Sequence, residues 1–464
     1  MRYARLLLLL VLFGINQVYA INSLLNIPPK YESNLSVLVI NAKTNQVIYN
    51  HNESTSRLIA SNMKLFTSVF GLYTLKPDFK WHTQLFYQGT ITQGNLNGNL
   101  YIKGGGDPTL DDNGLNKILK SLKQLGIKQI NGNIVIDDKI FNSEPSFSEL
   151  ERLPYDVDLI PPYALMVNEN ISKFTLNIRK NKISVSSNLY GYSIKNQFYI
   201  DKNRTECSHF SHGIVVTLDN KTISLKGAIP KACDNVDLIY YLIPNKTYVV
   251  MAIQRILNNL KIHLNGTYTY DSIPKDATMS FDYASDSLQQ IIIKMNHYSD
   301  NLIAETIFLS AGAYTTSNID TYKQSLELFN NFLKSNNLFQ GVTIENGSGV
   351  SRVERFSNQN IINLFGFIES LPMQKMIEIS LPSPGESGTL ETNFLSYKKQ
   401  LFAKTGTLND TLAYSGYFYS HLNNKYIISI IFNNIDATNK AEVDEIRNLV
   451  LSILAQIDSV NKVH

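Results

Sequence analysis

Apolar residues recur with two spacings along the chain, and together these spacings predict an α+β protein. Alternating apolar positions in residues 36–40 and 47–49 predict two strands joined by a turn at residues 43–46. The next apolar positions have the spacing of one helical face: Met63, Phe66, Val69, Phe70 and Tyr73. Pro77 bounds this helix, because proline cannot continue the backbone hydrogen bonding. A hairpin that leads into a helix predicts a sheet packed on helices.

The pattern changes after residue 78. Short alternating segments between Gly- and Asn-rich turns occupy residues 79–239, with an amphipathic helix at 115–125. This composition predicts one or two β-rich domains inserted into the first domain. We therefore assign residues 21–78 and 240–464 to the two parts of one interrupted domain.

Regular segments return in the second half of the chain. They are, in order, helices at 252–260 and 287–298, a helix that follows residue 301, strands at 401–408, 414–419 and 426–432, and a helix at 443–457. The late strands are apolar enough to complete a buried sheet with the hairpin near the N-terminus.

The first 20 residues have the pattern of a secretory signal peptide. Arg2 and Arg5 precede an apolar run at residues 6–14, and Val18-Tyr19-Ala20 supplies small residues near a cleavage site. The run is too short to span a bilayer. If it is not cleaved, the same segment would be a weak membrane anchor. We favour cleavage, which predicts an exported protein.

Length and composition indicate a globular protein. The chain has 464 residues, of which 44% are hydrophobic and 17% charged, enough for two or three domains. The net charge is +3 and no Lys/Arg-rich block occurs, which argues against a nucleic-acid partner. After the signal, no uninterrupted apolar stretch reaches the roughly 18 residues that a spanning helix needs.

The chain has two cysteines, Cys207 and Cys233. In an exported protein a single pair predicts a disulfide, which would stabilise the fold by about 3 kcal/mol through closure of the loop. Two buried thiols are the alternative. The spacing is not that of a structural metal site, so we predict no metal and no cofactor.

Three short motifs carry side chains suited to amide chemistry. Ser61-Asn62-Met63-Lys64 opens the first helix, and Ser299-Asp300-Asn301 falls in a break between two predicted helices. Lys404-Thr405-Gly406 lies in a predicted strand, where a glycine often marks close approach of a ligand or backbone. Each motif alone has a structural explanation, such as a helix-capping serine. All three in this order match the motifs of penicillin-binding proteins and class A β-lactamases.

The residue types fit acyl transfer. Ser61 is the candidate nucleophile, and Lys64, one helical turn away, is the candidate base. Lys64 must be neutral for this role, and burial and repulsion by Lys404 would lower its pKa. Ser299 would relay the proton to the leaving nitrogen, and Asn301 would bind a substrate carbonyl.

Substrate binding is predicted along Lys404, Thr405, Gly406 and Thr407. An extended peptide can add to the edge of such a strand, and the Lys and Thr side chains suit a terminal carboxylate. The backbone N–H groups of Ser61 and Thr407 are the candidate oxyanion hole.

With these motifs the chain resembles the low-molecular-mass class C penicillin-binding proteins, the D-alanyl-D-alanine carboxypeptidase/endopeptidase family of serine peptidases. The separation of the first two motifs supports this, since 299 − 61 = 238 residues leave room for inserted domains that class A β-lactamases lack. The resemblance covers essentially the whole mature chain. Further segments resemble the family: Gly106–Leu110, Tyr163–Leu165, Asn168–Asn170, Gly347–Arg352, Lys404–Leu408 and Ser415–Tyr417. Glu345-Asn346 and Ser383–Ser387 depart from it, which bears on substrate preference.

The resemblance implies a transpeptidase-like domain, an antiparallel sheet flanked by helices. It implies a periplasmic enzyme that cleaves D-Ala-D-Ala termini, or D-Ala–diaminopimelate cross-links, of peptidoglycan stem peptides, and that β-lactams acylate. It leaves open peripheral association with the membrane or cell wall, and the oligomeric state. Two alternatives are a catalytically idle penicillin-binding scaffold and a β-lactamase or esterase.

Overall fold

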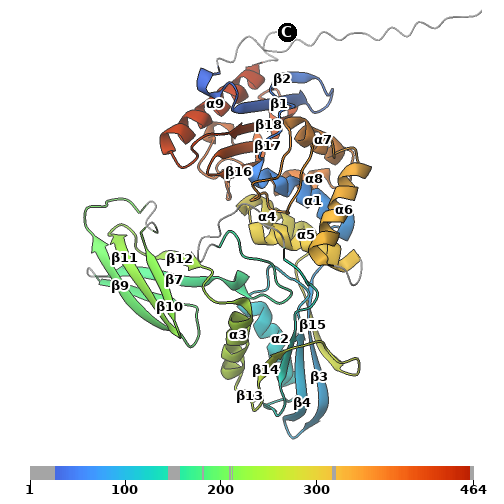
Figure 1. Ribbon diagram of the computed structural model, residues 1–464, viewed down its shortest axis with the longest axis vertical. Coiled ribbons are helices and arrows are strands. Elements are labelled where there is room, and N and C mark those ends of the chain that lie inside the picture. Colours follow the sequence, from blue (N-terminus) through green and yellow to red (C-terminus); the bar gives the residue numbers. More distant parts are fainter. Residues whose placement is uncertain are drawn as a thin grey trace, which may run out of the picture.

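The computed structural model describes residues 27–144, 157–179, 182–207, 211, 213–315 and 320–459. The predicted signal peptide, residues 1–20, lies outside this range. The described chain forms an elongated molecule with a sheet and helices at one end, a second sheet at the other, and a β unit projecting sideways (Figure 1). None of the helices in the described part is long and apolar enough to cross a membrane. The α+β class predicted from the sequence is confirmed.

The upper sheet combines strands from the N-terminal and the C-terminal parts of the chain. Its five strands, all in antiparallel pairs, have the order β16-β17-β18-β1-β2. They are β1 (Leu35–Asn41), β2 (Val47–His51), β16 (Leu401–Leu408), β17 (Thr411–Tyr419) and β18 (Lys425–Asn433). The predicted hairpin β1–β2 is confirmed, and β1 pairs with β18, for example Val37 with Ile430. Strand β16 lies at the edge of the sheet.

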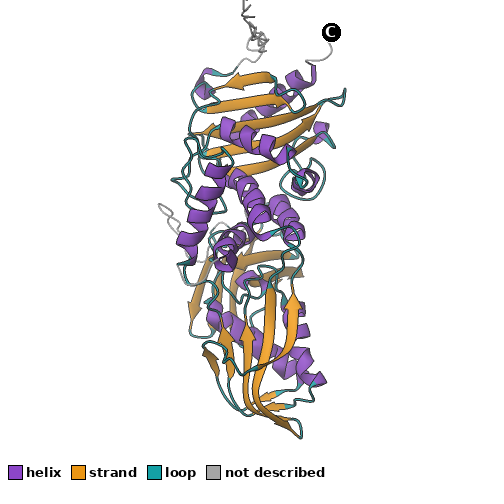
Figure 2. Cartoon of the chain, turned by 90° about the vertical axis from the view of Figure 1, so that its right-hand side faces the viewer, coloured by secondary structure: helices purple, strands orange, loops and turns teal. Residues whose placement is uncertain are grey.

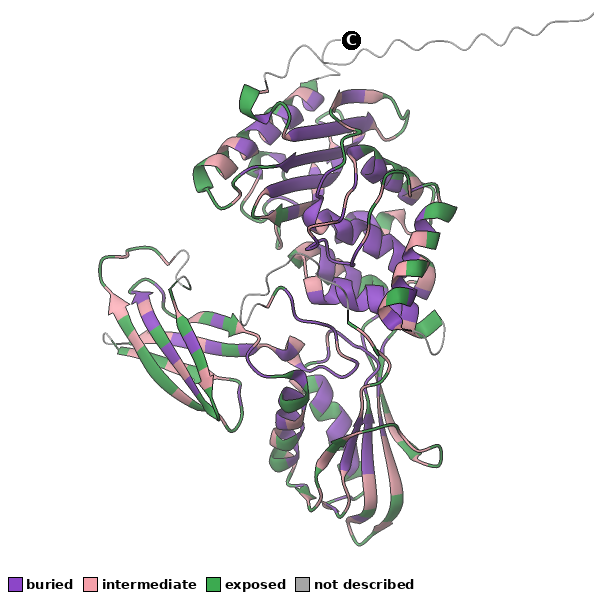
Figure 3. Ribbon diagram, viewed as in Figure 1, coloured by how far each residue is buried: buried purple, intermediate pink, exposed green. Residues whose placement is uncertain are grey.

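Helices cover both faces of this sheet, as Figure 2 shows from the side. Helix α9 (Lys440–Ser459) packs on one face. The helices on the other face are α1 (Met63–Leu75), α4 (Leu288–Tyr298), α5 (Asn301–Thr315), α6 (Thr321–Ser335), α7 (Asn358–Glu369) and α8 (Gln374–Ser380). Short 3₁₀ turns are η1 (Pro29–Tyr31), η2 (Ala60–Asn62), η3 (Asn168–Asn170) and η4 (Leu395–Tyr397). Burial is greatest along these central strands and in α1 and α5 (Figure 3).

The lower sheet has seven strands and lies at the opposite end of the molecule. Its main path is β13-β5-β4-β3-β15, and β6 pairs with both β4 and β14. The strands are β3 (His82–Thr92), β4 (Asn95–Lys103), β5 (Gln129–Ile130), β6 (Ile134–Asp137), β13 (His263–Leu264), β14 (Tyr268–Tyr270) and β15 (Thr278–Ala284). Helices α2 (Asp112–Gln124) and α3 (Asn245–Leu260) contribute apolar residues to its core.

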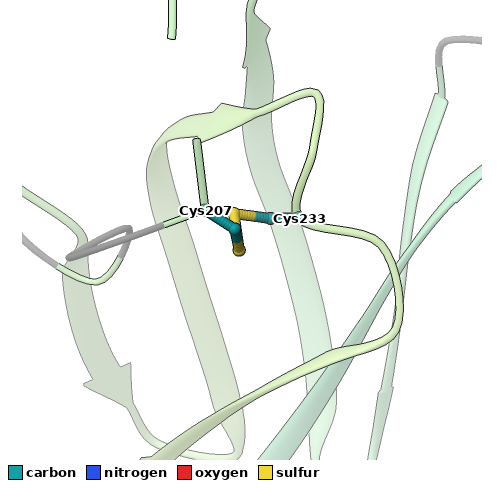
Figure 4. Close-up of a disulfide and its surroundings, with 2 residues drawn as sticks. All are labelled: Cys207 and Cys233. Carbon is teal, nitrogen blue, oxygen red and sulfur yellow. A yellow bond between two sulfur atoms is a disulfide. The ribbon is translucent and has the colours of Figure 1, made fainter. Parts of the chain in front are cut away.

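The projecting unit consists of two three-stranded sheets, β10-β11-β9 and β12-β7-β8. Its strands are β7 (Ser172–Arg179), β8 (Lys182–Ser187), β9 (Ser193–Asp201), β10 (Val215–Asp219), β11 (Thr222–Pro230) and β12 (Val236–Tyr240). A disulfide joins Cys207 and Cys233, whose Cα atoms are 5.0 Å apart (Figure 4). The bridge ties the segment after β9 to the β11–β12 connection, and fully buried Cys233 belongs to the core.

The chain enters and leaves the lower sheet at one place. Trp81 N donates to Ser285 Oγ at 3.0 Å, and Ser285 N donates to the Trp81 carbonyl at 2.9 Å. Strand β3 starts at His82, which pairs with Ala284 at the end of β15. Residues 240–284 thus pack with the preceding insertion. We therefore propose an inserted part of residues 82–284, in place of the expected 79–239.

Candidate active site

Ser61 lies in the 3₁₀ turn that leads into α1. The helix-capping explanation does not hold, because the residue before α1 is Asn62 and its end has no side-chain cap. Ala60, just before Ser61, has a φ of +48°, in the left-handed region that alanine rarely adopts. The turn leaves Ser61 at the wall of a cleft. α1 is buried on nearly every side, more than the single apolar face predicted from the sequence.

Lys64 is fully buried and donates to three oxygen atoms. Its Nζ atom lies 2.9 Å from Ser61 Oγ, 2.6 Å from Asn301 Oδ1 and 2.7 Å from the Ser348 carbonyl oxygen. The first two candidate motifs therefore meet at this amine, although they are far apart in the sequence. The Ser348 contact was not foreseen, because a backbone carbonyl leaves no mark in the sequence.

Burial lowers the pKa of Lys64 to about 8, against the opposing influence of Glu305 and Asp300. We expected repulsion by Lys404 to lower it as well, but burial is the main cause. The reciprocal effect is visible at Lys404, whose pKa is well below its usual value because of burial and the nearby Lys64. Two buried lysines in one site favour neutral amines.

Lys404 connects the third motif to the second. It lies on β16, fully buried, and its Nζ atom donates to Ser299 Oγ at 2.8 Å and to the Thr405 carbonyl at 2.7 Å. Ser299 ends α4 with a φ of +61°, a left-handed residue that turns the chain toward α5. Serine rarely adopts this conformation, and such strain is common at functional sites.

Asn301 joins the inserted part to the site. Its Oδ1 atom accepts from Lys64, and its Nδ2 atom donates to the Asp158 carbonyl at 3.1 Å. This bond uses one of the two N–H groups of Nδ2, and the other stays our predicted donor to a substrate carbonyl. Asp158 and Leu159 consequently form part of the cleft wall.

Gly406 allows β16 to lie against the Ser61 turn. A Cβ atom at this position would come within 2.8 Å of the Ile59 carbonyl oxygen and 3.1 Å of Ser61 N. Those neighbours are backbone atoms that cannot move aside easily. The predicted close approach at this glycine is thus present. On the other side of the strand, Thr405 Oγ1 donates to Thr389 Oγ1 at 2.7 Å.

A cleft of about 860 Å³ opens between β16, the Ser61 turn and the Asp158 segment. It contains Ser61, Ser299, Asn301, Thr405 and Thr407 from the predicted set. Sequence reasoning missed several other lining residues: Asp158, Tyr298, Asn393, Tyr414 and Arg447. They carry no local motif, so only the fold brings them together.

Arg352 also lines the cleft, and it lies in the Gly347–Arg352 segment noted in the sequence. Its guanidinium forms two hydrogen bonds with the carboxylate of Asp410, at 2.8 and 2.5 Å. In the described part of the chain, no three His, Cys, Asp or Glu side chains are grouped as metal ligands would be.

Comparison with known proteins agrees with this arrangement. The family model for D-Ala-D-Ala carboxypeptidase 3 (S13) matches residues 17–456. The chain belongs to this family. The resemblance inferred from the three motifs is thereby confirmed, and the chain is placed among the serine-type D-Ala-D-Ala carboxypeptidases.

Relatives of this S13 protein have similar sequences and folds. It is 29% identical to the D-alanyl-D-alanine carboxypeptidase DacB of Haemophilus influenzae over 405 residues, which cover 83% of this chain and 82% of DacB. It is 24% identical to a D-alanyl-D-alanine carboxypeptidase of an Actinomadura strain, covering 82% of this chain and 74% of that protein.

Among solved structures, penicillin binding protein 4 from Haemophilus influenzae superposes with a TM-score of 0.78 at 23% identity, covering 92% of this chain and 96% of that one. A predatory endopeptidase from Bdellovibrio bacteriovorus gives a TM-score of 0.54 at 14% identity, covering 91% and 92%. These likenesses show the fold, and they confirm the predicted transpeptidase-like domain with inserted β-rich domains.

Proposed function

We propose that this S13 protein is a periplasmic peptidase that cleaves D-Ala-D-Ala termini, or D-Ala–diaminopimelate cross-links, of peptidoglycan through an acyl-enzyme on Ser61. The observation that carries the proposal is the 2.9 Å contact between Lys64 Nζ and Ser61 Oγ at the wall of an open cleft. The predicted signal peptide supports the periplasmic location.

The hydrogen bonds of Lys64 support its role as the base. The Asn301 Oδ1 atom and the Ser348 carbonyl can only accept, so they take both N–H groups of a neutral amine. The lone pair of that amine then faces the Ser61 hydroxyl. Ser61 Oγ attacks the peptide carbonyl, and its proton passes to Lys64. The resulting ammonium already has its three acceptors in place.

Protonation of the leaving amine falls to Ser299. When the tetrahedral intermediate collapses, the C–N bond breaks and the nitrogen needs a proton. The hydroxyl of Ser299 accepts a hydrogen bond from Lys404, which leaves its own proton available to donate. We assign Ser299 the relay between Lys64 and the leaving nitrogen. Water then hydrolyses the Ser61 ester.

Strand β16 is the proposed binding edge for the substrate. It is the last strand of the upper sheet, so backbone groups on its outer side can pair with an extended peptide. Thr405 and Thr407 line the cleft and suit the terminal carboxylate. The backbone N–H groups of Ser61 and Thr407 are the proposed oxyanion hole, and loss of one such donor costs about 10²–10³ in rate.

A fluorescent penicillin tests the proposal, because a β-lactam carries an amide that Ser61 would attack in the same way. We expect covalent labelling of the wild-type protein and none of the Ser61→Ala variant. Labelling that persists in Ser61→Ala would refute the assignment of the nucleophile.

Digestion of purified sacculi separates the remaining alternatives. We expect muropeptides shortened by one D-Ala, or cross-linked dimers converted to monomers, and neither product with Ser61→Ala. A folded, labelled protein without either product would be an idle scaffold. Rapid release of the penicilloyl group would instead indicate a β-lactamase.

A further inference from the structure

Two buried carboxyl groups hold four consecutive backbone N–H groups of the loop at residues 345–348. Glu354 Oε1 accepts from the N–H groups of Glu345 and Asn346 at 3.1 and 2.8 Å. Glu305 accepts from Gly347 at 3.1 Å and from Ser348 at 2.8 Å, one N–H on each carboxylate oxygen. Only 1% of Glu305 and 2% of Glu354 is exposed, so neither group is a surface feature.

The carbonyl groups of the same loop point to the opposite side, toward α1. The Gly347 carbonyl accepts from Thr67 Oγ1 at 2.6 Å, and the Ser348 carbonyl accepts from Lys64 Nζ at 2.7 Å. Gly347 lies close against α5, where an added Cβ atom would approach Phe308 Cβ to 2.7 Å. The Gly347–Ser348 peptide group is therefore fixed between the Glu305 carboxylate and Thr67 of the catalytic helix, and the Ser348 carbonyl begins the next peptide group.

A buried carboxylate bonded to backbone N–H groups carries a large desolvation cost. A neutral glutamine would fill the same space, but its amide group would place an N–H donor against one of the two backbone donors. The carboxylate is the side-chain end group of this size that accepts from both N–H groups at once. This chemistry indicates a requirement for the peptide groups on both sides of Gly347 to be held in one orientation.

We propose that Glu305 is a positioning residue: it fixes the Gly347–Ser348 peptide group, which immediately precedes the Ser348 carbonyl and so directs that carbonyl at Lys64 Nζ, and it places a negative charge near the amine. The inference deepens the proposed function and rests on it, because it assumes that Lys64 is the base. The Ser348 carbonyl in turn keeps one N–H of Lys64 engaged, so that the amine lone pair faces Ser61.

The charge has a predictable effect on acylation. An anion near Lys64 stabilises its ammonium form and raises its pKa. Both oxygens of Glu305 accept from backbone N–H groups, as those of an ionised carboxylate do, while burial raises the pKa of this group to about 7. The other charged groups that act on these two residues are Asp158, Asp300, Glu354 and Lys404, and Glu345 acts on Glu354.

The Glu305→Gln variant tests the inference through the acylation rate of a fluorescent penicillin, measured against pH. The rate is expected to rise with pH and then reach a plateau. Removal of the anion is expected to move this rising limb by about one pH unit to lower pH. Loss of one backbone acceptor is expected to lower the plateau rate by about tenfold, because small misplacement of a catalytic group is costly. Rates are normalised to the labelled fraction at completion, which removes the effect of misfolded molecules.

The Glu354→Gln variant is the matched control. It breaks the same kind of contact in the same loop, but at Glu345 and Asn346, which precede Gly347, and the charge of Glu354 acts on Lys64 less than that of Glu305 does. We expect the rising limb and the plateau rate of Glu354→Gln to stay close to those of the wild type. A merely structural role for Glu305 would make the two variants behave alike, and an unmoved limb with an unchanged plateau in Glu305→Gln would overturn the inference.

Glu305→Asp decides the question if Glu305→Gln does not fold. It keeps the charge but is one methylene shorter, so we expect a lower plateau with the limb at the wild-type pH. A plateau equal to the wild type would overturn the inference. Failure of the wild type to label would overturn the proposed function and this inference with it, whereas a labelled wild type with unaffected Glu305 variants overturns the inference alone.

Discussion

Opposing electrostatic effects act on the amine of Lys64. Burial removes water from the ammonium and lowers its pKa, while the carboxylates of Glu305 and Asp300 act in the other direction. Burial has the larger effect, which leaves the pKa at about 8. The free base is thus available near neutral pH without being fully populated.

The rate of acylation is expected to follow the neutral fraction of Lys64. Below the pKa of about 8 this fraction rises with pH, so the rate constant for labelling should increase by about tenfold per pH unit and then level off above it. Stopped-flow labelling with the fluorescent penicillin at pH values below and above about 8 measures this rise of the rate constant. A rate that is flat from about pH 6 to 9 would contradict the role of Lys64 as the base.

Asn301→Asp offers a test with the opposite sign to that of Glu305→Gln. The substitution keeps the shape of the side chain but places a carboxylate where Oδ1 lies 2.6 Å from Lys64 Nζ. The ammonium gains a partner and its pKa rises, so the rising limb should move to higher pH by one unit or more. At neutral pH we expect acylation to be slower by about tenfold. A limb that stays in place would show that this oxygen does not act on Lys64.

At the scale of residues, the sequence predicted the side chains of the site but not the backbone group that contacts Lys64. Ser61, Lys64, Ser299, Asn301 and Lys404 were found because their spacing in motifs is visible in the sequence. The Ser348 carbonyl, which accepts from Lys64, was not found, because any residue type supplies a carbonyl.

At the scale of elements, the site depends on how closely β16 approaches the turn η2. Gly406 is the contact point, since a side chain there would meet the Ile59 carbonyl at 2.8 Å. Position 406 of strand β16 therefore cannot carry a side chain, which interrupts the alternation of apolar residues that is usual in a strand.

Gly406→Ala is expected to push β16 away from Ser61. The added methyl group meets backbone atoms, so we expect a loss of about 1–3 kcal/mol in the free energy of unfolding and strongly reduced labelling. Gly366→Ala is the control, because Gly366 lies exposed within α7 with no atom near the added Cβ. A helix gains about 0.5–1 kcal/mol from this change. Equal labelling by both variants would contradict the role of the contact.

Helices and strands whose apolar residues recur with a clear period were predicted from the sequence, and others were missed. The strands β1, β2, β16, β17 and β18 and the helices α2, α4 and α9 appear where the pattern placed them. The helices α6, α7 and α8 were not predicted, although they contribute to the same apolar core as α1, α4 and α5. Polar residues within them, such as buried Asn358, obscure the apolar face, and only the packed fold satisfies them.

At the scale of the whole molecule, the chain enters and leaves the inserted part at one junction, where Trp81 and Ser285 are hydrogen-bonded to each other. Trp81 is the only tryptophan of the chain and is fully buried at this junction, where Nε1 donates to Ser310 Oγ at 2.8 Å. Its fluorescence therefore reports on the upper part of the molecule and the junction. The disulfide lies far along the chain, in the projecting unit.

Reduction of the disulfide, or the double substitution Cys207→Ala and Cys233→Ala, should weaken the projecting unit alone. The bridge closes a separation of 26 residues, which corresponds to about 3 kcal/mol of stabilisation. We expect far-UV circular dichroism to show a transition at lower temperature, while the fluorescence transition of Trp81 and penicillin labelling stay at the values of the oxidised protein. Ser61→Ala with the intact bridge controls for loss of labelling without loss of stability. If the Trp81 and dichroism transitions shifted together, the projecting unit and the catalytic part would unfold as one cooperative body.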